Sequence, residues 1–337
     1  METKTELEKD ISFSRAKIFF YIFAGILFIF AVYYFSEIKS DVALFVNVKP
    51  LWLIVAILAQ GGTYLAGAAI YHNLIEAFDD APLIPILKLF QANIVTLFID
   101  QTIPSADISG IMFFFNFIKK KGIDEPDAFS LILVELLTFY VTILSIIFAL
   151  ILICLFIKGI PAYFIVILML GLVIFGVLGT VAWLLGQGQT IFFLVKKLSK
   201  ISFLKHIFEK YKLSPFKKLK SPGSIFKKHT YALIGAALLQ VCILLFDSLT
   251  ILALFYGLGL PVALSSIFLV FILSKIISSL PISPGSLVVY EAGMTLFFVT
   301  LGVPVATAAI VTILYRVLSF WLPMPIGFLL YRKLLDF

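Results

Sequence analysis

The sequence predicts an all-α, polytopic integral membrane protein, and three observations lead to this fold class. Hydrophobic residues make up 62% of the chain and charged residues only 13%, and the mean hydropathy is +1.12. At about 20 residues per crossing plus short loops, the chain accommodates roughly seven or eight crossings. Prolines interrupt two of the hydrophobic tracts, near Pro104 and Pro284, which predicts helices that break inside the bilayer.

We expect about six full spans, because each of these apolar runs is long enough to cross about 30 Å of hydrocarbon. In chain order their limits are 18–35, 51–71, 128–157, 161–185, 231–255 and 306–330. The first run is too long for the core of a signal peptide and lacks a small-residue cleavage site, so we expect it to remain in the protein. Two broken or re-entrant helical tracts, 83–117 and 262–302, complete the predicted fold.

Lysines determine the predicted orientation. Residues 196–228 contain eleven lysines and one acid, Glu209, whereas the loop at 256–261 contains no charged residue. Because positively charged loops stay on the cytoplasmic side, we place the lysine-rich loop inside. The protein is therefore expected to be a multi-pass protein of the cell (inner) membrane with cytoplasmic N- and C-termini.

This orientation makes the two irregular tracts open to opposite sides. The tract 83–117 begins and ends inside, and its length falls short of the more than about 40 residues that two crossings and a turn require. A re-entrant hairpin with its tip near Pro104 fits better. The tract 262–302 begins and ends outside. It accommodates two thin spans or a second hairpin, and its prolines and Gly285 favour a break.

The whole chain, 1–337, is predicted to form one transmembrane domain whose halves, 18–157 and 231–330, are related by inversion around a basic cytoplasmic loop at 190–230. Each half has a helix, a proline tract and a second helix. Short similarities support the relation: the tripeptides Ile103-Pro104-Ser105 and Ile282-Ser283-Pro284, and the pairs Phe113–Phe114 and Phe297–Phe298. Inverted repeats with broken helices are typical of transporters whose substrate site lies at the midplane.

Charged residues at mid-depth are the candidate site residues, because each costs about 2.5 to 3.5 kcal/mol to place there. At 1.5 Å per residue, Glu291, Arg316 and Asp247 lie about 16, 15 and 12 Å from the outer ends of their helices. Asp107 occupies a comparable depth on the opposing tip. Glu135 is a further intramembrane acid. Asp247 and Glu135 are predicted to be functional, although either can instead cap backbone at a helix irregularity.

Lys275 and Glu291 are equidistant from Ser283, so in an antiparallel hairpin they stand level and can pair. An ion pair that only allows the hairpin to insert explains this pattern as well as a ligand site does. Arg316 is a fixed cation that suits an anionic head group, although a salt bridge to Glu291 would serve structure alone. Lys88 and Asp100, near the ends of their tract, are expected to snorkel.

The other titratable residues predict no cofactor chemistry. Cys154 and Cys242 lie in apolar runs as small hydrophobic residues, and the histidines His72, His206 and His229 have no second ligand at useful spacing. We therefore expect no disulfide and no metal site. No nucleotide-binding motif is present, so we expect a gradient or a partner to supply any energy.

The lysine-rich loop is expected to bind anionic lipid of the inner leaflet. Aromatic and aliphatic residues alternate with its lysines, as in segments that lie on a membrane surface. Nucleic acid explains this pattern less well and is not an expected partner.

The second break resembles a known family. The run from Pro281 to Glu291 is followed by Gly302, Tyr315, Arg316, Pro323 and Gly327. This is similar to the C-terminal signature of the flippase-like family that includes the membrane domain of lysylphosphatidylglycerol synthases. The family pattern is Ser-Pro-Gly-Gly-x-Gly-x-x-Glu, and Ser286 and Val288 stand here for its second and third glycines.

The first half fits the family more loosely. Asn93, Pro104, Ser105 and Ala106 match, whereas the usual Gly-Gly-acid and arginine are replaced by Asp107, Ile108, Ser109 and Gly110. Glu135 matches an acidic position whose customary arginine neighbour is Leu136. The resemblance implies a lipid-handling membrane protein: in some relatives an exporter of aminoacylated phospholipid, in others a carrier associated with hopanoid or polyprenyl-glycan pathways. We expect no soluble aminoacyl-transfer domain after Phe337, and so no synthase activity.

We therefore expect a transporter that moves a polar-headed lipid between leaflets, and not an enzyme. Arg316 would hold the phosphate, and the second break would shape the site through Lys275, Ser283, Pro284, Gly285 and Glu291. Asp107, Glu135 and Asp247 would accept a cationic group or couple protons. Two alternatives remain: an intramembrane enzyme acting on lipid phosphates, for which we find no clustered acids and no serine or cysteine beside a base, and a lipid-binding scaffold for a lipid-biosynthetic enzyme.

Overall fold

A computed structural model describes residues 48–77, 81–103, 108–157, 160–187, 229–279, 286 and 288–335. Contacts divide the chain into two units, Met1–Val48 and Lys49–Phe337, and all of the described residues except Val48 belong to the second unit. The described residues are helical or in short turns, which confirms the all-α prediction. The predicted helix 18–35 and the basic loop 190–230 lie outside the described residues.

Within the described part of the chain, five stretches of helix are long and apolar enough to cross a membrane. They are α3 (Pro50–Glu76), α6 (Glu125–Phe156), α7 (Ala162–Gly186), α11 (Thr230–Gly257) and the stretch Val305–Leu334, which comprises α14 (Val305–Arg316), the π-helix η4 (Val317–Trp321) and most of α15 (Pro323–Leu335). Prolines occupy or precede most of their starts, where a missing N–H costs nothing. The predicted limits differ from these by at most a few residues, apart from a further turn at the end of α3 and at the end of α15.

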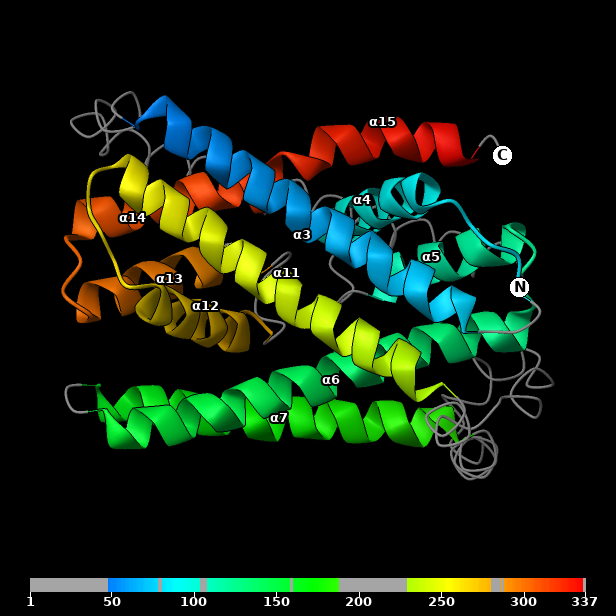
Figure 1. The fold of residues 1–337 in the computed structure, drawn as a ribbon, viewed down its shortest axis with the longest axis horizontal. Coiled ribbons are helices and arrows are strands. Elements are labelled where there is room, and N and C mark those ends of the chain that lie inside the picture. The colour runs from blue at the N-terminus through cyan, green and yellow to red at the C-terminus, as the bar shows by residue number, and fades with distance from the viewer. Residues whose placement is uncertain are drawn as a thin grey trace, which may run out of the picture. The chain divides into compact units, whose positions relative to one another are not determined.

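Helices α3 and α11 lie side by side in opposite directions through the middle of the molecule (Figure 1). Backbone and side-chain hydrogen bonds tie both ends of the pair: Lys49 N donates to Gly257 O at 3.0 Å, and Asn73 Nδ2 donates to Ala232 O at 2.6 Å. The Asn73 bond also explains why α3 continues past its predicted end at Tyr71.

Both irregular tracts form hairpins of two short helices. Helix α4 (Ile86–Thr102) packs on α5 (Ile108–Lys120), and α12 (Leu264–Ser278) packs on α13 (Val289–Thr300). Each arm has 12 to 17 residues, fewer than the about 20 that a full crossing requires. The hairpin α4–α5 opens toward the end of the molecule where α6 begins, and α12–α13 opens toward the opposite end (Figure 1).

The two hairpins end in the same turn. Gly122 and Gly302, 180 positions apart, have φ of +94° and +90°, which glycine adopts without strain. In both turns the next residue donates its N–H back across the glycine: Ile123 to Ile118 O at 3.3 Å, and Val303 to Phe298 O at 3.1 Å. The buried positions also correspond: Gly110, Phe114, Phe117 and Ile118 in α5, and Tyr290, Met294, Phe297 and Phe298 in α13. The pairs Phe113–Phe114 and Phe297–Phe298, which support the relation in sequence, do not occupy equivalent positions, because Phe297 corresponds to Phe117.

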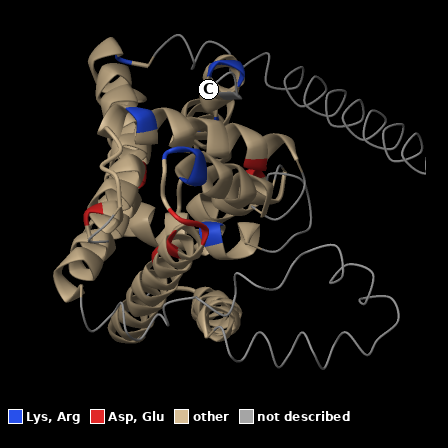
Figure 2. Cartoon of the chain, turned by 90° about the vertical axis from the view of Figure 1, so that its right-hand side faces the viewer, with Lys and Arg blue, Asp and Glu red and all other residues tan. Residues whose placement is uncertain are grey.

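Apolar side chains both fill the interior and cover the outside. One buried cluster is built mainly on α6, α7 and α11–α14, and another on α3–α6 and part of α11. Half of the most apolar window of α11 is buried but only 22% of that of α7, so α11 is central and α7 peripheral. In the described helices, viewed from one end, acidic and basic segments are few, and some of them lie among the helices (Figure 2).

Candidate functional site

Arg316 and Glu291 form an ion pair inside the bundle. Arg316 Nε donates to Glu291 Oε1 at 2.6 Å, and the two side chains are 11% and 25% exposed. Arg316 ends α14, and Glu291 lies in the first turn of α13, where the helix N-terminus stabilises a carboxylate. Glu291 Oε2 is buried and has no hydrogen-bond partner among the described residues. The carboxylate therefore keeps one acceptor for another group.

Aromatic rings surround the guanidinium. Its Cζ lies 4.9 Å from the centre of the Tyr290 ring and 4.3 Å from that of Phe320, distances typical of cation–π contacts. Tyr290 stacks on Tyr315 with ring centres 6.2 Å apart. These contacts fix the orientation of the guanidinium plane, so the cation is held in place and not merely buried.

The predicted pairing of Lys275 with Glu291 is wrong, because Glu291 bonds to Arg316 instead. The Lys275 ammonium lies 5.3 Å from the centre of the Phe271 ring, one turn earlier on α12, and attracts the carboxylate of Asp247 on α11. Equal spacing from Ser283 did not predict the partner, since the side chains of α12 and α13 contact α11 and α14 as well as each other.

The helix that carries Arg316 changes its geometry directly after it. In η4 a backbone N–H donates to the carbonyl five residues earlier, as the bond of 2.8 Å from Leu322 N to Val317 O shows. The next bond in this register would come from Pro323, which has no N–H. The Leu318 carbonyl left without that donor accepts a hydrogen bond from the Tyr64 hydroxyl at 2.7 Å. Such π-helical turns are frequent at functional sites, and the prediction of one regular helix over 306–330 missed this one.

The second break ends in two residues whose positive φ angles are normally found at glycine. Ser286 has φ +53° and Val288 has φ +70°, with ψ −48° at Val288. These are the two positions at which the family pattern has glycine. A β-branched residue with positive φ is strained, so this chain holds the start of α13 in a costly conformation beside Glu291.

Asp247 lies in the interior between α3 and α11 and is 4% exposed. Gln60 Nε2 donates to its Oδ1 at 3.3 Å, and Thr63 Oγ1 donates to the same oxygen at 3.2 Å. The Tyr315 hydroxyl also faces this carboxylate. None of these contacts caps backbone, so the capping alternative does not describe Asp247.

Glu135 has a similar setting in the first half. Gln240 Nε2 on α11 donates to its Oε1 at 3.2 Å, and the Tyr71 hydroxyl of α3 faces it. Gln60 and Gln240 are both buried and are 180 positions apart, like Gly122 and Gly302. Each central helix thus uses an equivalent glutamine to hold an acid. The sequence-based prediction of the site did not include these glutamines. A repeat could have revealed them, because the segments Leu53–Gln60 and Leu233–Gln240 share the pattern Leu-Ile-x-Ala-x-Leu-x-Gln.

Asp100 does not snorkel as predicted. Its Oδ1 accepts a hydrogen bond of 2.8 Å from Gly110 N, which joins the two arms of the hairpin α4–α5 near the tip. A Cβ at position 110 would overlap the carboxylate. Glycine at this position therefore allows Asp100 to cap the first turn of α5. The predicted site residues Asp107, Ser283, Pro284 and Gly285 lie outside the described residues.

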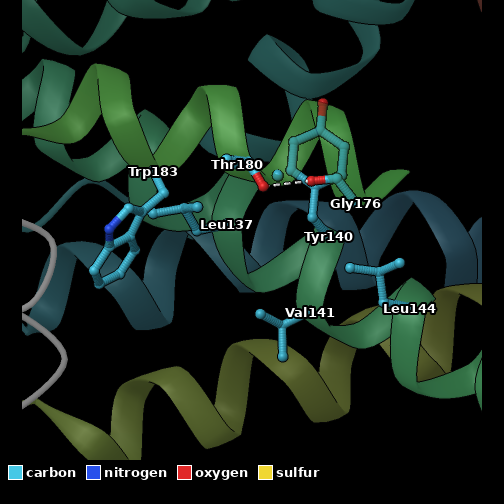
Figure 3. Close-up of a pocket in the computed structure, with 8 residues that line it drawn as sticks. Leu137, Tyr140, Val141, Leu144, Gly176, Thr180 and Trp183 are labelled. Carbon is cyan, nitrogen blue, oxygen red and sulfur yellow. Dashed lines mark hydrogen bonds between the residues drawn. The ribbon is translucent and has the colours of Figure 1, made fainter. Parts of the chain in front are cut away.

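A shallow apolar groove of about 250 Å³ lies apart from these charges, between α6 and α7 (Figure 3). Thr180 Oγ1, on its wall, donates to Gly176 O at 2.8 Å. The lining residues are Leu137, Tyr140, Val141, Leu144, Gly176, Gly179, Thr180 and Trp183, and none of them is charged.

The fold and these buried charges define a class: an α-helical membrane protein with two broken hairpins and a polar centre. Within this class, residues 17–327 match the family model described as the lysylphosphatidylglycerol synthase TM region, and the chain belongs to that family. The chain is 23% identical over 308 residues to a UPF0104 membrane protein of Methanocaldococcus jannaschii, a match that covers 90% of each chain. No solved structure matches the chain.

Proposed function

We propose that this protein moves a polar-headed lipid, such as a phospholipid, from one leaflet of the membrane to the other. The observation that carries the proposal is the Arg316–Glu291 pair, held among aromatic rings beside the strained backbone that precedes α13 and the π-helical turn η4. Ionised side chains inside a membrane are costly and usually mark the path of a substrate or an ion.

The pair offers complementary chemistry to a lipid head group. A guanidinium recognises a phosphate by charge and by planar hydrogen bonding. Glu291 Oε2, the acceptor without a partner among the described residues, suits an ammonium or hydroxyl donor on the same head group. A phosphate and a donor a few ångströms apart are the shared features of phospholipid head groups.

The two hairpins support transport over passive binding. Their arms are too short to cross a bilayer, they open toward opposite ends, and the central helices α3 and α11 are antiparallel. We interpret the hairpins as re-entrant and the halves as an inverted repeat, the arrangement in which one half rocks against the other around a midplane site.

Reconstituted vesicles provide the test. A phospholipid labelled on its head group is placed in both leaflets, and a membrane-impermeant quencher reports how fast inner-leaflet lipid reaches the outside. We expect the protein to accelerate this exchange and the variant Arg316→Lys to lose most of it, because an ammonium offers only a point charge. The matched control is Arg332→Lys, at the end of α15, where the guanidinium contacts Phe328.

The same vesicles separate the alternatives. Mass spectrometry of the extracted lipid detects chemical turnover, which would support an intramembrane enzyme. Lipid that binds but neither moves nor changes would support a scaffold for a partner enzyme. Exchange at the parental rate in Arg316→Lys would refute the role of Arg316 and leave it as a structural ion-pair residue.

A further inference from the structure

A polar stripe runs along α3 between the two buried acids. Thr63 and Tyr64 follow Gln60 by three and four residues, and Tyr71 follows Tyr64 by seven, which places all four on one face of the helix. Gln60 and Thr63 contact Asp247 of α11, and Tyr71 faces Glu135 of α6. One helix thus connects the acids of the two halves.

The amide of Gln60 is only half satisfied. Its Nε2 donates to Asp247 Oδ1, but its Oε1 is buried and accepts no hydrogen bond among the described residues, and the residue is 2% exposed. A buried acceptor without a donor is costly and calls for an explanation. A carboxylate cannot supply the donor, whereas a protonated carboxylic acid can.

Protonation of Asp247 on Oδ2 would complete a cyclic pair with this amide. The amide N–H already donates to Oδ1, and the new acid O–H would donate to the amide Oε1. One O–H bond forms at Asp247 as one O–H bond of a hydronium ion breaks, water is left behind, and no electron is transferred. The groups already around Oδ1 are donors, Gln60 Nε2 and Thr63 Oγ1, and they suit an acid or its anion better than a metal cation, which requires several oxygen acceptors.

We propose that Asp247 and Glu135 are exchangeable proton sites and that their protonation drives the hairpin movements of lipid transport. The coupling part of this inference rests on the proposed function; the proton binding does not. Gln240 Nε2 donates to Glu135 Oε1 as Gln60 Nε2 donates to Asp247 Oδ1, and on this shared contact the inference extends from Asp247 to Glu135, the acid of the other half.

Lys275 provides the link from Asp247 to the hairpin. Ionised Asp247 attracts the ammonium of Lys275 on α12, across the boundary between α11 and the arm. Neutral Asp247 loses this attraction, because the charge–charge interaction disappears. Protonation therefore releases α12, the arm whose partner α13 carries Glu291.

The titratable groups that face Asp247 are Tyr64 on α3, Lys275 on α12, Tyr290 on α13 and Tyr315 on α14. Tyr71 on α3 faces Glu135 directly, and Asp100 on α4 acts on Tyr71.

Infrared difference spectroscopy tests proton binding without any transport assay. The full-length protein in lipid is titrated, and the carboxylic C=O band of protonated, buried acids is followed. We expect Asp247→Asn and Glu135→Gln each to remove one titrating component, and Asp124→Asn, an exposed acid before α6, to leave these components in place. Spectra of Asp247→Asn and Glu135→Gln that keep every component of the parent would overturn the inference.

A second variant guards against misfolding. Gln60→Met keeps the side-chain length but removes both the amide donor and the amide acceptor, so the Asp247 band should remain and shift in frequency as both hydrogen bonds of the pair are lost. An unshifted band would overturn the acid–amide pair.

Vesicles then test the coupling. We expect the rate of lipid exchange by the parent protein to change with an imposed proton gradient. The rate of exchange by Asp247→Asn should not depend on the gradient. Exchange that responds to a sodium gradient at constant pH, or a parental rate that ignores the proton gradient, would overturn the coupling while leaving lipid transport intact. A parent without lipid exchange would refute the proposed function, and with it the coupling, and the infrared result would still decide the proton sites.

Discussion

The Tyr64 hydroxyl on α3 donates to the Leu318 carbonyl oxygen in η4 at 2.7 Å, and this bond joins the first half of the molecule to the helix that carries Arg316. Removal of the hydroxyl in Tyr64→Phe leaves the carbonyl unpaired in the interior. We expect a loss of about 1–3 kcal/mol of unfolding free energy, measured by thermal or denaturant unfolding in detergent. Tyr163→Phe is the control, because its bond of 2.7 Å to Thr300 Oγ1 is exposed. Equal effects of the two substitutions would contradict a special role for the buried bond.

The Arg316–Glu291 pair should behave as a unit. Glu291→Gln leaves a buried guanidinium without its counter-ion, for which we expect a loss of about 3 kcal/mol. The reversed pair Glu291→Arg with Arg316→Glu should recover part of this loss, which a double-mutant cycle measures. Lys119→Gln, which breaks the more exposed ion pair of 3.2 Å with Glu125, should cost at most about 1 kcal/mol. Additive effects at 291 and 316 would show that the two residues are not energetic partners.

The strained backbone at Val288 predicts that glycine stabilises the protein. Relief of a positive φ at a β-branched residue outweighs the extra unfolded-state freedom of glycine, with a net gain of about 1 kcal/mol. Val173→Gly is the matched control: another exposed valine, but inside α7, where glycine should cost about 1 kcal/mol. The melting temperatures should therefore move in opposite directions. A fall for Val288→Gly would mean that Val288 contributes contacts worth more than the strain.

Two helical glycines should respond differently to alanine. A Cβ at Gly327 of α15 would lie 3.0 Å from the Ile94 carbonyl oxygen and closer still to Phe98 of α4, whereas a Cβ at Gly176 of α7 would meet nothing within 4 Å. We expect Gly327→Ala to destabilise the protein by forcing α15 from α4, and Gly176→Ala to stabilise it by about 0.5–1 kcal/mol. Unfolding of the two variants in the same detergent decides between these signs.

The predicted orientation is open to cysteine labelling. In a background without Cys154 and Cys242, a cysteine at Lys120 should react with an impermeant reagent only after the membrane is opened. A cysteine at Ala263, at the other end of the molecule, should react in intact cells. Reaction of Lys120→Cys from outside would reverse the orientation and place both termini on the other side.

The sequence by itself determined the fold class and most helix limits. Apolar runs of membrane length specify α3, α6, α7 and α11, and prolines precede or open the first three, because the bilayer requires every backbone group to be bonded within its own helix. The length of the tract 83–117 already favoured a re-entrant hairpin, whereas that of 262–302 left two thin spans or a hairpin open, and its prolines and Gly285 favoured a break. Arg316 and Glu291 were identified as site residues because charge inside an apolar run is rare.

Only the tertiary structure decided which charges meet. Glu291 bonds to Arg316 and not to Lys275, and Asp100 caps the opposite arm of its hairpin, because side-chain partners depend on the rotation and packing of helices that are far apart in sequence. The π-helical turn of η4 likewise depends on Tyr64, a donor more than 250 positions earlier in the chain. Spacing along a sequence sets the depth of a residue in the membrane; the direction in which it points, and so the bond it makes, is set by the neighbouring helices.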